Sequence, residues 1–209
     1  MDDSVVIALF RHGLTALNKQ KAYIGWTDAP ISEEEKERLA NQAYYGFPYD
    51  FIISSDLTRC LQTAEILFPW KKVYKMNQFR ELHFGEWEGK TYEQLKNDTN
   101  YIEWLHAPFE VTPPGGENFQ MFNNRVDEGW KQIVEMIERN RVKKVAIVTH
   151  EGVIRDLLLK YANSHKQFWE WHVPHGTGFE LIWNCQTAFR RGERCTLLRE
   201  VPLTANQHG

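Results

Sequence analysis

The sequence predicts an α/β protein with a mainly parallel β-sheet, because short apolar runs alternate with amphipathic segments along its 209 residues. Two of these runs, Ser4–Phe10 and Lys143–Thr149, are almost continuously apolar and rich in β-branched residues, as expected of strands buried on both faces. Each run leads into a histidine that is followed within two residues by glycine. Polar residues at such strand ends are typical of sheets that bind ligands at their carboxyl edge.

In the first third of the chain the pattern alternates between strands and helices. After the first strand we expect a short helical turn and a turn-rich loop over residues 15–31. Ser32 is expected to begin a helix that runs to Tyr45, because serine can cap the first turn and the three glutamates after it suit the positive end of the helix dipole. Beyond this helix we expect the strand Phe51–Ser54, the amphipathic helix Asp56–Leu67 and the strand Lys72–Tyr74.

The strand pattern stops between about Phe79 and Phe119, where glycine, proline and aromatic residues dominate. We interpret this stretch as a cap of loops and short helices, inserted into a single domain that spans residues 1–209. After the cap we expect the long helix Glu117–Asn140, the strand Lys143–Thr149, the helix Gly152–Tyr161 and a closing hairpin formed by Phe179–Trp183 and Thr196–Leu198.

Charge and composition exclude several classes of partner. With 25 lysines and arginines against 28 acidic residues the net charge is −3, so we expect neither nucleic acid nor an anionic membrane surface as a partner. No apolar stretch has the length of a membrane span, and the acidic start Met1-Asp2-Asp3 is unlike a signal peptide. Three cysteines without zinc-site or disulfide spacing favour a cytoplasmic protein. Eight tryptophans predict a large aromatic core or an aromatic-lined pocket.

Residues suited to binding phosphate follow several of the expected strands. His12 and His150 come at the carboxyl ends of two buried strands, and in a parallel sheet these ends lie on the same side. Arg11 precedes His12, and Arg59 lies near the start of the helix after the second strand, so both guanidinium groups are expected at the same edge. Asn18 adds a neutral donor. This set, without an acidic cluster spaced to hold a metal, is suited to a phosphate dianion.

The motifs that carry this chemistry resemble those of the histidine phosphatase superfamily, which contains the cofactor-dependent phosphoglycerate mutases and related phosphatases. The matching blocks run in family order over residues 4–155. They are Arg11-His12-Gly13 with Thr15 and Asn18, then Ser54–Arg59 with Thr63-Ala64-Glu65, then Glu81 within Arg80–Gly89, and finally Thr149–Arg155. The resemblance implies a three-layer α/β/α sandwich around a six-stranded mixed sheet with one antiparallel strand.

The resemblance also implies a covalent mechanism in which His12 is phosphorylated on a ring nitrogen. Two fixed guanidinium charges would help to keep this imidazole neutral, as a nucleophile requires. Glu81 would protonate the leaving alcohol and then activate water, with Glu86 or Glu88 in the same loop as the alternative. No metal and no cofactor are implied. The residues expected to hold the phosphoryl group are Arg11, Arg59, His150, Asn18 and Gly152.

Other residues bear on the choice of substrate. Four aromatic residues either line the entrance, where they would select an apolar or aromatic leaving group, or pack within the cap: Trp26, Phe84, Trp87 and Trp104. Two residues depart from the family pattern at the pocket rim, because Leu14 stands where many members have glutamate and Glu151 where glycine is commoner. Arg155 is expected to form a structural ion pair, and His175 is not expected to be catalytic.

Taken with the resemblance, these residues predict a metal-independent phosphomonoester hydrolase that acts on small phosphorylated metabolites through a phosphohistidine intermediate. A phosphoglycerate mutase is one alternative, but it needs extra cations for a second phosphate, and residues 91–112 contain only Lys96 against four acidic residues. A phospho-ligand sensor without catalysis is the other alternative, although pure binding needs no acid–base carboxyl group. The sequence leaves open the natural substrate and whether the chain forms a homo-oligomer.

Overall fold

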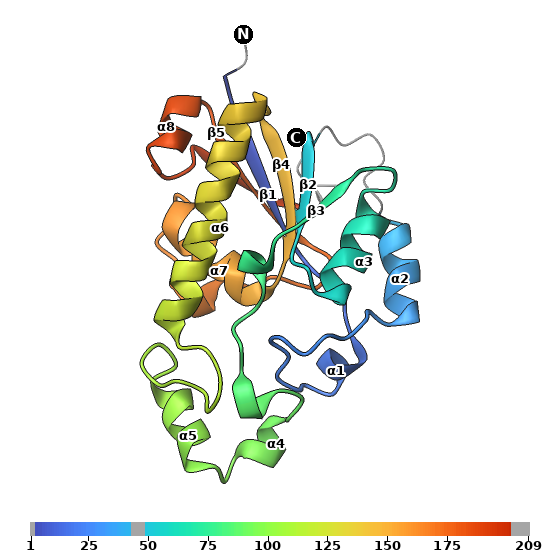
Figure 1. The fold of residues 1–209 in the computed structure, drawn as a ribbon, viewed down its shortest axis with the longest axis vertical. Helices are drawn as coiled ribbons and strands as arrows, with labels where there is room; N and C mark the ends of the chain where they lie inside the picture. The colour runs from blue at the N-terminus through green and yellow to red at the C-terminus, as the bar shows by residue number, and fades with distance from the viewer. Residues whose placement is uncertain (1–2, 43–48, 202–209) are drawn as a thin grey trace.

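A six-stranded β-sheet forms the centre of the molecule (Figure 1). The computed structural model describes residues 3–42 and 49–201. The strands are β1 (Val5–Arg11), β2 (Phe51–Ser54), β3 (Val73–Lys75), β4 (Lys144–Thr149), β5 (Gly178–Trp183) and β6 (Leu197–Val201), in the order β3-β2-β4-β1-β5-β6. Of the described strands, β5 alone runs opposite to the other five, which confirms the prediction of a mixed sheet with one antiparallel strand.

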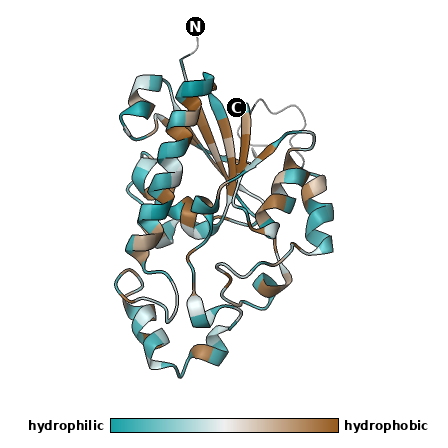
Figure 2. Ribbon diagram, in the orientation of Figure 1, coloured by the Kyte–Doolittle hydropathy of each residue, from teal (hydrophilic) through white to brown (hydrophobic). Residues whose placement is uncertain are grey.

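Helices cover both faces of the sheet, so the molecule has the three layers that the resemblance implied (Figure 1). One face is covered by α6 (Phe119–Asn140), α7 (Glu151–Tyr161) and α8 (Gln186–Arg190), and the other by α2 (Glu33–Ala40) and α3 (Thr58–Leu67). Figure 2 shows hydrophobic strands between helices whose outward faces are hydrophilic. Each of these five helices therefore buries an apolar face in the core beside the sheet.

The first strand, β1, occupies an interior position of the sheet between β4 and β5. Its residues from Val5 to Phe10 are all buried, and successive side chains contribute to the cores on opposite faces. Arg11 is paired with Thr149 at the last step of the β1–β4 ladder, so the two chains leave the sheet side by side. The backbone N–H of His12 then donates to the Thr149 carbonyl oxygen at 2.9 Å, which fixes how the first turn after β1 lies against β4.

The helix α2 begins after Ser32 as expected but ends earlier, and the helix α3 begins later than expected. Ser32 is the N-cap residue of α2, but its hydroxyl makes no capping hydrogen bond. This helix ends at Ala40, and the expected end at Tyr45 lies outside the described residues. The next helix, α3, begins at Thr58 instead of Asp56, because the Asp28 carboxylate accepts hydrogen bonds from the backbone N–H and the hydroxyl of Thr58 at 2.7 Å each.

The segment expected to form the cap contains no β-strand in the structure and lies beyond the carboxyl edge of the sheet (Figure 1). Its helices are α4 (Tyr92–Leu95) and α5 (Thr99–His106), with the 3₁₀-helices η1 (Asn77–Phe79) and η2 (Gly85–Trp87) before them. The segment has its own aromatic core, which consists of Trp87, Leu95, Tyr101 and Trp104. A hydrogen bond of 2.7 Å between the hydroxyls of Tyr23 and Tyr101 connects it to the loop that follows α1 (Ala16–Lys19).

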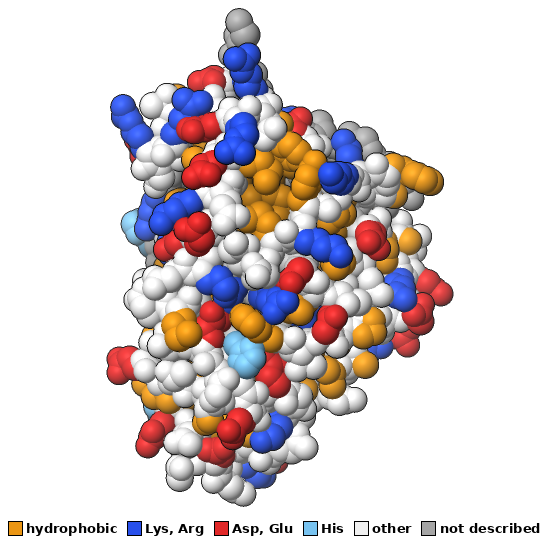
Figure 3. All heavy atoms as spheres, viewed as in Figure 1, with side chains coloured by type: hydrophobic (Ala, Val, Ile, Leu, Met, Phe, Trp, Pro, Cys, Tyr) orange, Lys and Arg blue, Asp and Glu red, His pale blue; other side chains and the backbone are white. Residues whose placement is uncertain are grey.

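Acidic and basic side chains are interspersed over the face seen in Figure 3, as the small net charge of −3 leads one to expect. No large area of this face carries one sign of charge. None of the helices in the described ranges combines the length and the apolar composition needed to cross a bilayer.

Candidate active site

His12 and His150 meet at the carboxyl edge of the sheet, where β1 and β4 end. Their ring centroids are 5.1 Å apart, and only 5% of His12 and none of His150 is exposed to solvent. A third imidazole, that of His175, has its centroid 5.2 Å from the His12 ring and donates its Nδ1–H to the His12 carbonyl oxygen. The strand order therefore brings together the two histidines that the sequence placed at separate strand ends.

The hydrogen bond at His12 Nδ1 fixes which ring nitrogen is available for reaction. Nδ1 lies 2.8 Å from the carbonyl oxygen of Gly13. Because a carbonyl oxygen only accepts, Nδ1 must carry the hydrogen, and in the neutral imidazole Nε2 then holds the lone pair. The Gly13 N–H in turn donates to the Thr63 hydroxyl on α3 at 2.8 Å, which holds this turn in place. His12 is thus held by its own backbone with the Nε2 lone pair free of this hydrogen bond.

Arg59 is completely buried next to His150 and is held by a loop from the first part of the chain. Its two terminal nitrogens donate to the carbonyl oxygens of Thr27 at 2.8 Å and Gly25 at 2.6 Å, and one of them lies 3.2 Å from His150 Nδ1. His150 Nε2 faces the Ser55 hydroxyl at 3.0 Å. The guanidinium group therefore has a fixed orientation, as recognition of a phosphoryl group requires.

The carboxylate of Glu88 holds the loop that orients Arg59. It accepts hydrogen bonds of 2.7 to 3.1 Å from the backbone N–H groups of Gly25, Trp26, Thr27 and Phe84. Burial raises the pKa of Glu88, but these hydrogen bonds outweigh it and leave the pKa below its usual value. Glu88 is therefore an ionised structural carboxylate. The other alternative to Glu81 is Glu86, which is exposed on η2 and does not line the cavity described below.

Glu81 lies against the start of α7, the helix that follows His150. Its carboxylate accepts hydrogen bonds from the backbone N–H of Gly152 at 3.0 Å and of Leu82 at 2.9 Å. Burial raises the pKa of Glu81, and it outweighs the opposing effect of these hydrogen bonds and of the nearby Arg59 charge. A carboxyl group with a raised pKa has the property needed for proton transfer near neutral pH.

Gly152 is required by the close approach of Glu81. A methyl group at position 152 would overlap the Glu81 Oε1 atom and would also be in close contact with the carboxyl carbon. Gly152 lies within the first turn of α7, so its backbone conformation itself would accept alanine. The absence of a side chain at this position is therefore what lets the Glu81 carboxylate reach the helix N–H.

For the phosphatase activity that the sequence predicts, Gly152→Ala is expected to lower kcat for phenyl phosphate by roughly 10- to 100-fold, because the methyl group would displace the Glu81 carboxyl group. The measurement is steady-state kinetics in the wild type and in a Glu81→Gln background. In that background the additional loss should be small, since both substitutions act on the same proton transfer. Equal losses in the two backgrounds would show that Gly152 acts independently of Glu81.

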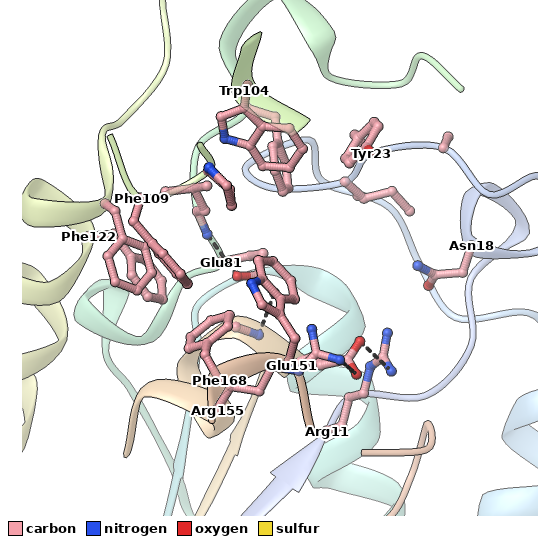
Figure 4. A pocket seen from close by; sticks show the side chains of 18 residues that line it. Arg11, Asn18, Tyr23, Glu81, Trp104, Phe109, Phe122, Glu151, Arg155 and Phe168 are labelled. Carbon is pink, nitrogen blue, oxygen red and sulfur yellow. Dashed lines mark hydrogen bonds and ion pairs between the residues drawn. The ribbon is translucent and has the colours of Figure 1, made fainter. Parts of the chain in front are cut away.

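A cavity of about 270 Å³ opens next to these residues, between the sheet edge and the cap (Figure 4). Its polar lining includes Arg11, Asn18, Glu81, Glu151 and Arg155. Much of the remaining wall is aromatic and comes from the loop after α1, the cap, α6 and η3 (Phe168–Glu170): Tyr23, Phe84, Trp104, Phe109, Phe119, Phe122, Phe168 and Trp169. The aromatic-lined pocket that the eight tryptophans predicted is present, although only two tryptophans line it.

The remaining predicted site residues take different positions relative to this cavity. Asn18 lines the cavity, but its side-chain oxygen accepts hydrogen bonds from the backbone N–H and hydroxyl of Thr15, so that Asn18 is part of the capping box of α1.

Trp26 does not line the cavity. Its ring packs on His83 and Arg80, and its Nε1–H donates to the Glu81 carbonyl oxygen at 3.0 Å. Trp87 is buried in the cap core. His12, Arg59 and His150 lie outside the cavity lining.

The environment of the histidines favours their neutral forms. Burial, and then electrostatic interactions with Arg59, His175 and Arg11, hold the pKa of His12 well below its usual value. Burial and Arg59 lower the pKa of His150 in the same way, and burial lowers the pKa of His175 to about 4. Within the described residues, no three His, Cys, Asp or Glu side chains are grouped so that they could hold a metal ion.

Three interactions were not predicted from the sequence. The ion pair of 2.8 Å between Glu151 and Arg11 was not expected. The second ion pair of Glu151, at 2.7 Å to Arg155, confirms the ion pair expected of Arg155, and all three residues line the cavity. The contact of His175 with His12 depends on the loop between η3 and β5. An aromatic-lined pocket was expected, with Phe84 and Trp104 as candidates for its entrance, but the wall residues from positions 108–122 and 168–169 were not, because only the folded chain brings them together. For Glu151 the signal was its departure from the glycine common at this position.

Comparison with known proteins agrees with this arrangement. The chain is 26% identical over 175 residues to the adenosylcobalamin/alpha-ribazole phosphatase of Escherichia coli strain K12, an alignment that covers 80% of this chain and 85% of that protein. It is 22% identical over 222 residues to a 2,3-bisphosphoglycerate-dependent phosphoglycerate mutase of Chlamydia felis, which covers 90% and 97%. The crystal structure of the alpha-ribazole phosphatase of Shigella flexneri has the same fold, with a TM-score of 0.75 at 24% identity and 87% and 92% coverage.

The family assignment rests on most of the chain. The model of the histidine phosphatase superfamily (branch 1) matches residues 7–188, which include both histidines, both arginines and Glu81. The sheet order and the convergence of His12 and His150 follow from the same segments of the sequence. The chain belongs to the histidine phosphatase superfamily.

Proposed function

We propose that this protein is a metal-independent phosphomonoester hydrolase that acts through a phosphohistidine at His12, on small phosphorylated metabolites with an apolar or aromatic leaving group. The observation that carries the proposal is the hydrogen bond between His12 Nδ1 and the Gly13 carbonyl oxygen, which leaves the Nε2 lone pair for attack. The lowered pKa of His12 keeps this lone pair unprotonated near neutral pH. The aromatic wall of the cavity supports the choice of leaving group.

In the first step His12 Nε2 attacks phosphorus and the bond between phosphorus and the ester oxygen breaks. The Glu81 carboxyl group gives its proton to the departing oxygen, which leaves as an alcohol. The ring of His12 becomes positively charged, and the Gly13 carbonyl oxygen stabilises the Nδ1–H on this ring. Arg11 and Arg59 stabilise the charge on the phosphoryl oxygens, which is the main demand of a loose transition state.

In the second step the Glu81 carboxylate takes a proton from water, and the resulting hydroxide attacks phosphorus. The bond between phosphorus and Nε2 breaks, inorganic phosphate forms and His12 returns to its neutral state. Glu81 ends the cycle protonated, as it began. One carboxyl group with a raised pKa is therefore sufficient for both proton transfers.

The charges in the cavity favour a hydrolase over a mutase, even though a phosphoglycerate mutase is among the relatives. A mutase must hold a bisphosphate and so needs cations for a second anionic group. Among the lining residues in the described ranges, the cations are Arg11 and Arg155, and Glu151 pairs with both. A sensor without turnover would have no use for Glu81 at the reacting atoms. We also expect a cytoplasmic setting, since all three cysteines are free.

The proposal is tested with p-nitrophenyl phosphate. Hydrolysis should proceed equally with and without EDTA, and a rapid alkaline quench with a radiolabelled ester should leave label on the protein that acid releases. Loss of activity in EDTA, or turnover without this label, would contradict the proposal. Activity only on 3-phosphoglycerate with a bisphosphate primer would indicate the mutase, and phosphate binding without turnover would indicate the sensor.

A further inference from the structure

Glu151 occupies the position in the cavity where a second anionic group of a ligand would meet Arg155. It is the first residue of α7, directly after His150. One carboxylate oxygen lies 2.8 Å from a terminal nitrogen of Arg11 and the other lies 2.7 Å from a terminal nitrogen of Arg155. In Figure 4 the carboxylate lies between the two guanidinium groups at the end of the cavity nearest β1.

Both arginines are held from behind, so their positions do not depend on Glu151 alone. Arg11 donates to the Val173 carbonyl oxygen at 2.7 Å, and the Nε–H of Arg155 donates to the Trp171 carbonyl oxygen at 3.0 Å. The guanidinium carbon of Arg155 also lies 5.3 Å from the centroid of the Trp169 ring. Without the carboxylate, Arg155 would be an oriented cation beside Arg11, able to bind a carboxylate or phosphate group of a ligand.

The carboxylate changes what the cavity can accept beyond the phosphoryl group. Arg11 and Arg59 are needed for the phosphoryl group at His12, which leaves Arg155 as the remaining cation among the described lining residues. Glu151 already pairs with Arg155, and a second anion placed there would lie next to a negative charge. Like charges at such distances in a partly buried site repel strongly. The rest of the wall is mostly aromatic and offers an anion no compensation.

We propose that Glu151 is a specificity-determining residue, which occupies the second anion position of the cavity and so restricts the enzyme to phosphomonoesters whose leaving group carries no further negative charge. The disfavoured class comprises bisphosphates and phosphorylated carboxylic acids. This inference rests on the proposed hydrolase function. In this proposal the glutamate that replaces the usual glycine at position 151 excludes charged substrates and takes no part in the chemistry at His12.

The test compares two matched aryl esters, phenyl phosphate and 4-carboxyphenyl phosphate, in the wild type and in Glu151→Gln. The wild type should have a kcat/KM for phenyl phosphate at least about tenfold higher than for the carboxylated ester, because one additional charge is repelled. In Glu151→Gln this ratio should fall roughly tenfold, mainly through a lower KM for the carboxylated ester. Inhibition by inorganic phosphate should strengthen in the same variant.

Glu93→Gln is the matched control, since it removes the same charge from an exposed ion pair with Lys96 on α4. This control should leave the substrate ratio unchanged. An unchanged ratio in folded Glu151→Gln, or the same shift in Glu93→Gln, would overturn the inference. Glu151→Ser, which retains a good residue for a first helical turn, replaces the glutamine variant if that variant does not fold.

The wild-type measurement alone decides two further outcomes. Equal kcat/KM values for the two esters would overturn the role of Glu151 without the need for a variant. No hydrolysis of phenyl phosphate by the wild type would instead contradict the proposed function. The failure of the inference and the failure of the function therefore give different results.

Discussion

Replacing His12 with alanine is expected to abolish hydrolysis of p-nitrophenyl phosphate, with kcat reduced by at least about 10⁴-fold. The substitution removes the Nε2 lone pair, and no neighbouring group takes its place: the ring of His150 is buried beside Arg59, and the Nδ1–H of His175 donates to the backbone of residue 12. The acid-labile label trapped on the wild type should be absent from the variant. Circular dichroism and thermal unfolding check that the variant is folded.

The matched control for this experiment is His106→Ala. His106 is exposed at the end of α5, where its Nδ1 bonds only to the Ile102 carbonyl oxygen of its own helix. We expect this variant to retain wild-type kcat and labelling. If His12→Ala were folded and retained more than about one hundredth of the wild-type kcat, the nucleophile would have to be another residue.

The sheet and the pairing of the two histidines could be predicted because they depend on strong local patterns. Strands buried on both faces must be continuously apolar, so β1 and β4 stand out in the sequence. The parallel register then brings His12 and His150 together, because Arg11 is paired with Thr149 and each histidine is the next residue. The apolar strand pattern and the rule that parallel strands end at the same edge of a sheet were therefore sufficient to predict that His12 and His150 lie together.

The boundaries of the helices were less predictable because distant residues determine them. Asp56 resembles the start of a helix, but in the structure its carboxylate pairs with Arg80 at 2.6 Å. The first turn of α3 is instead completed by Asp28, which is 30 positions from Thr58. Local sequence contains no information about such a partner.

The roles of the acidic residues also required the folded chain. Glu81, Glu86 and Glu88 have similar neighbours in the sequence, and the alternatives stayed open there. In the structure Glu88 is occupied by four backbone N–H groups and Glu86 is exposed, whereas Glu81 lies in the cavity wall. Only tertiary contacts distinguish three carboxylates with the same chemistry, just as only they reveal that Glu151 lies between two arginines.

Glu81→Gln is expected to separate the two steps of the reaction. With an alkyl phosphate the first step should slow by about 10²–10⁴-fold, because the departing alkoxide needs a proton. With p-nitrophenyl phosphate the leaving group departs without a proton. A burst of one p-nitrophenol per enzyme should therefore precede slow turnover, since the variant has no base to activate water.

The raised pKa of Glu81 implies that wild-type activity on alkyl phosphates falls as pH rises through that pKa, because the general acid becomes ionised. This basic limb should be absent from the variant. Glu86→Gln is the control and should show normal kinetics. Equal slowing of the first step for both esters would mean that Glu81 is not the proton donor.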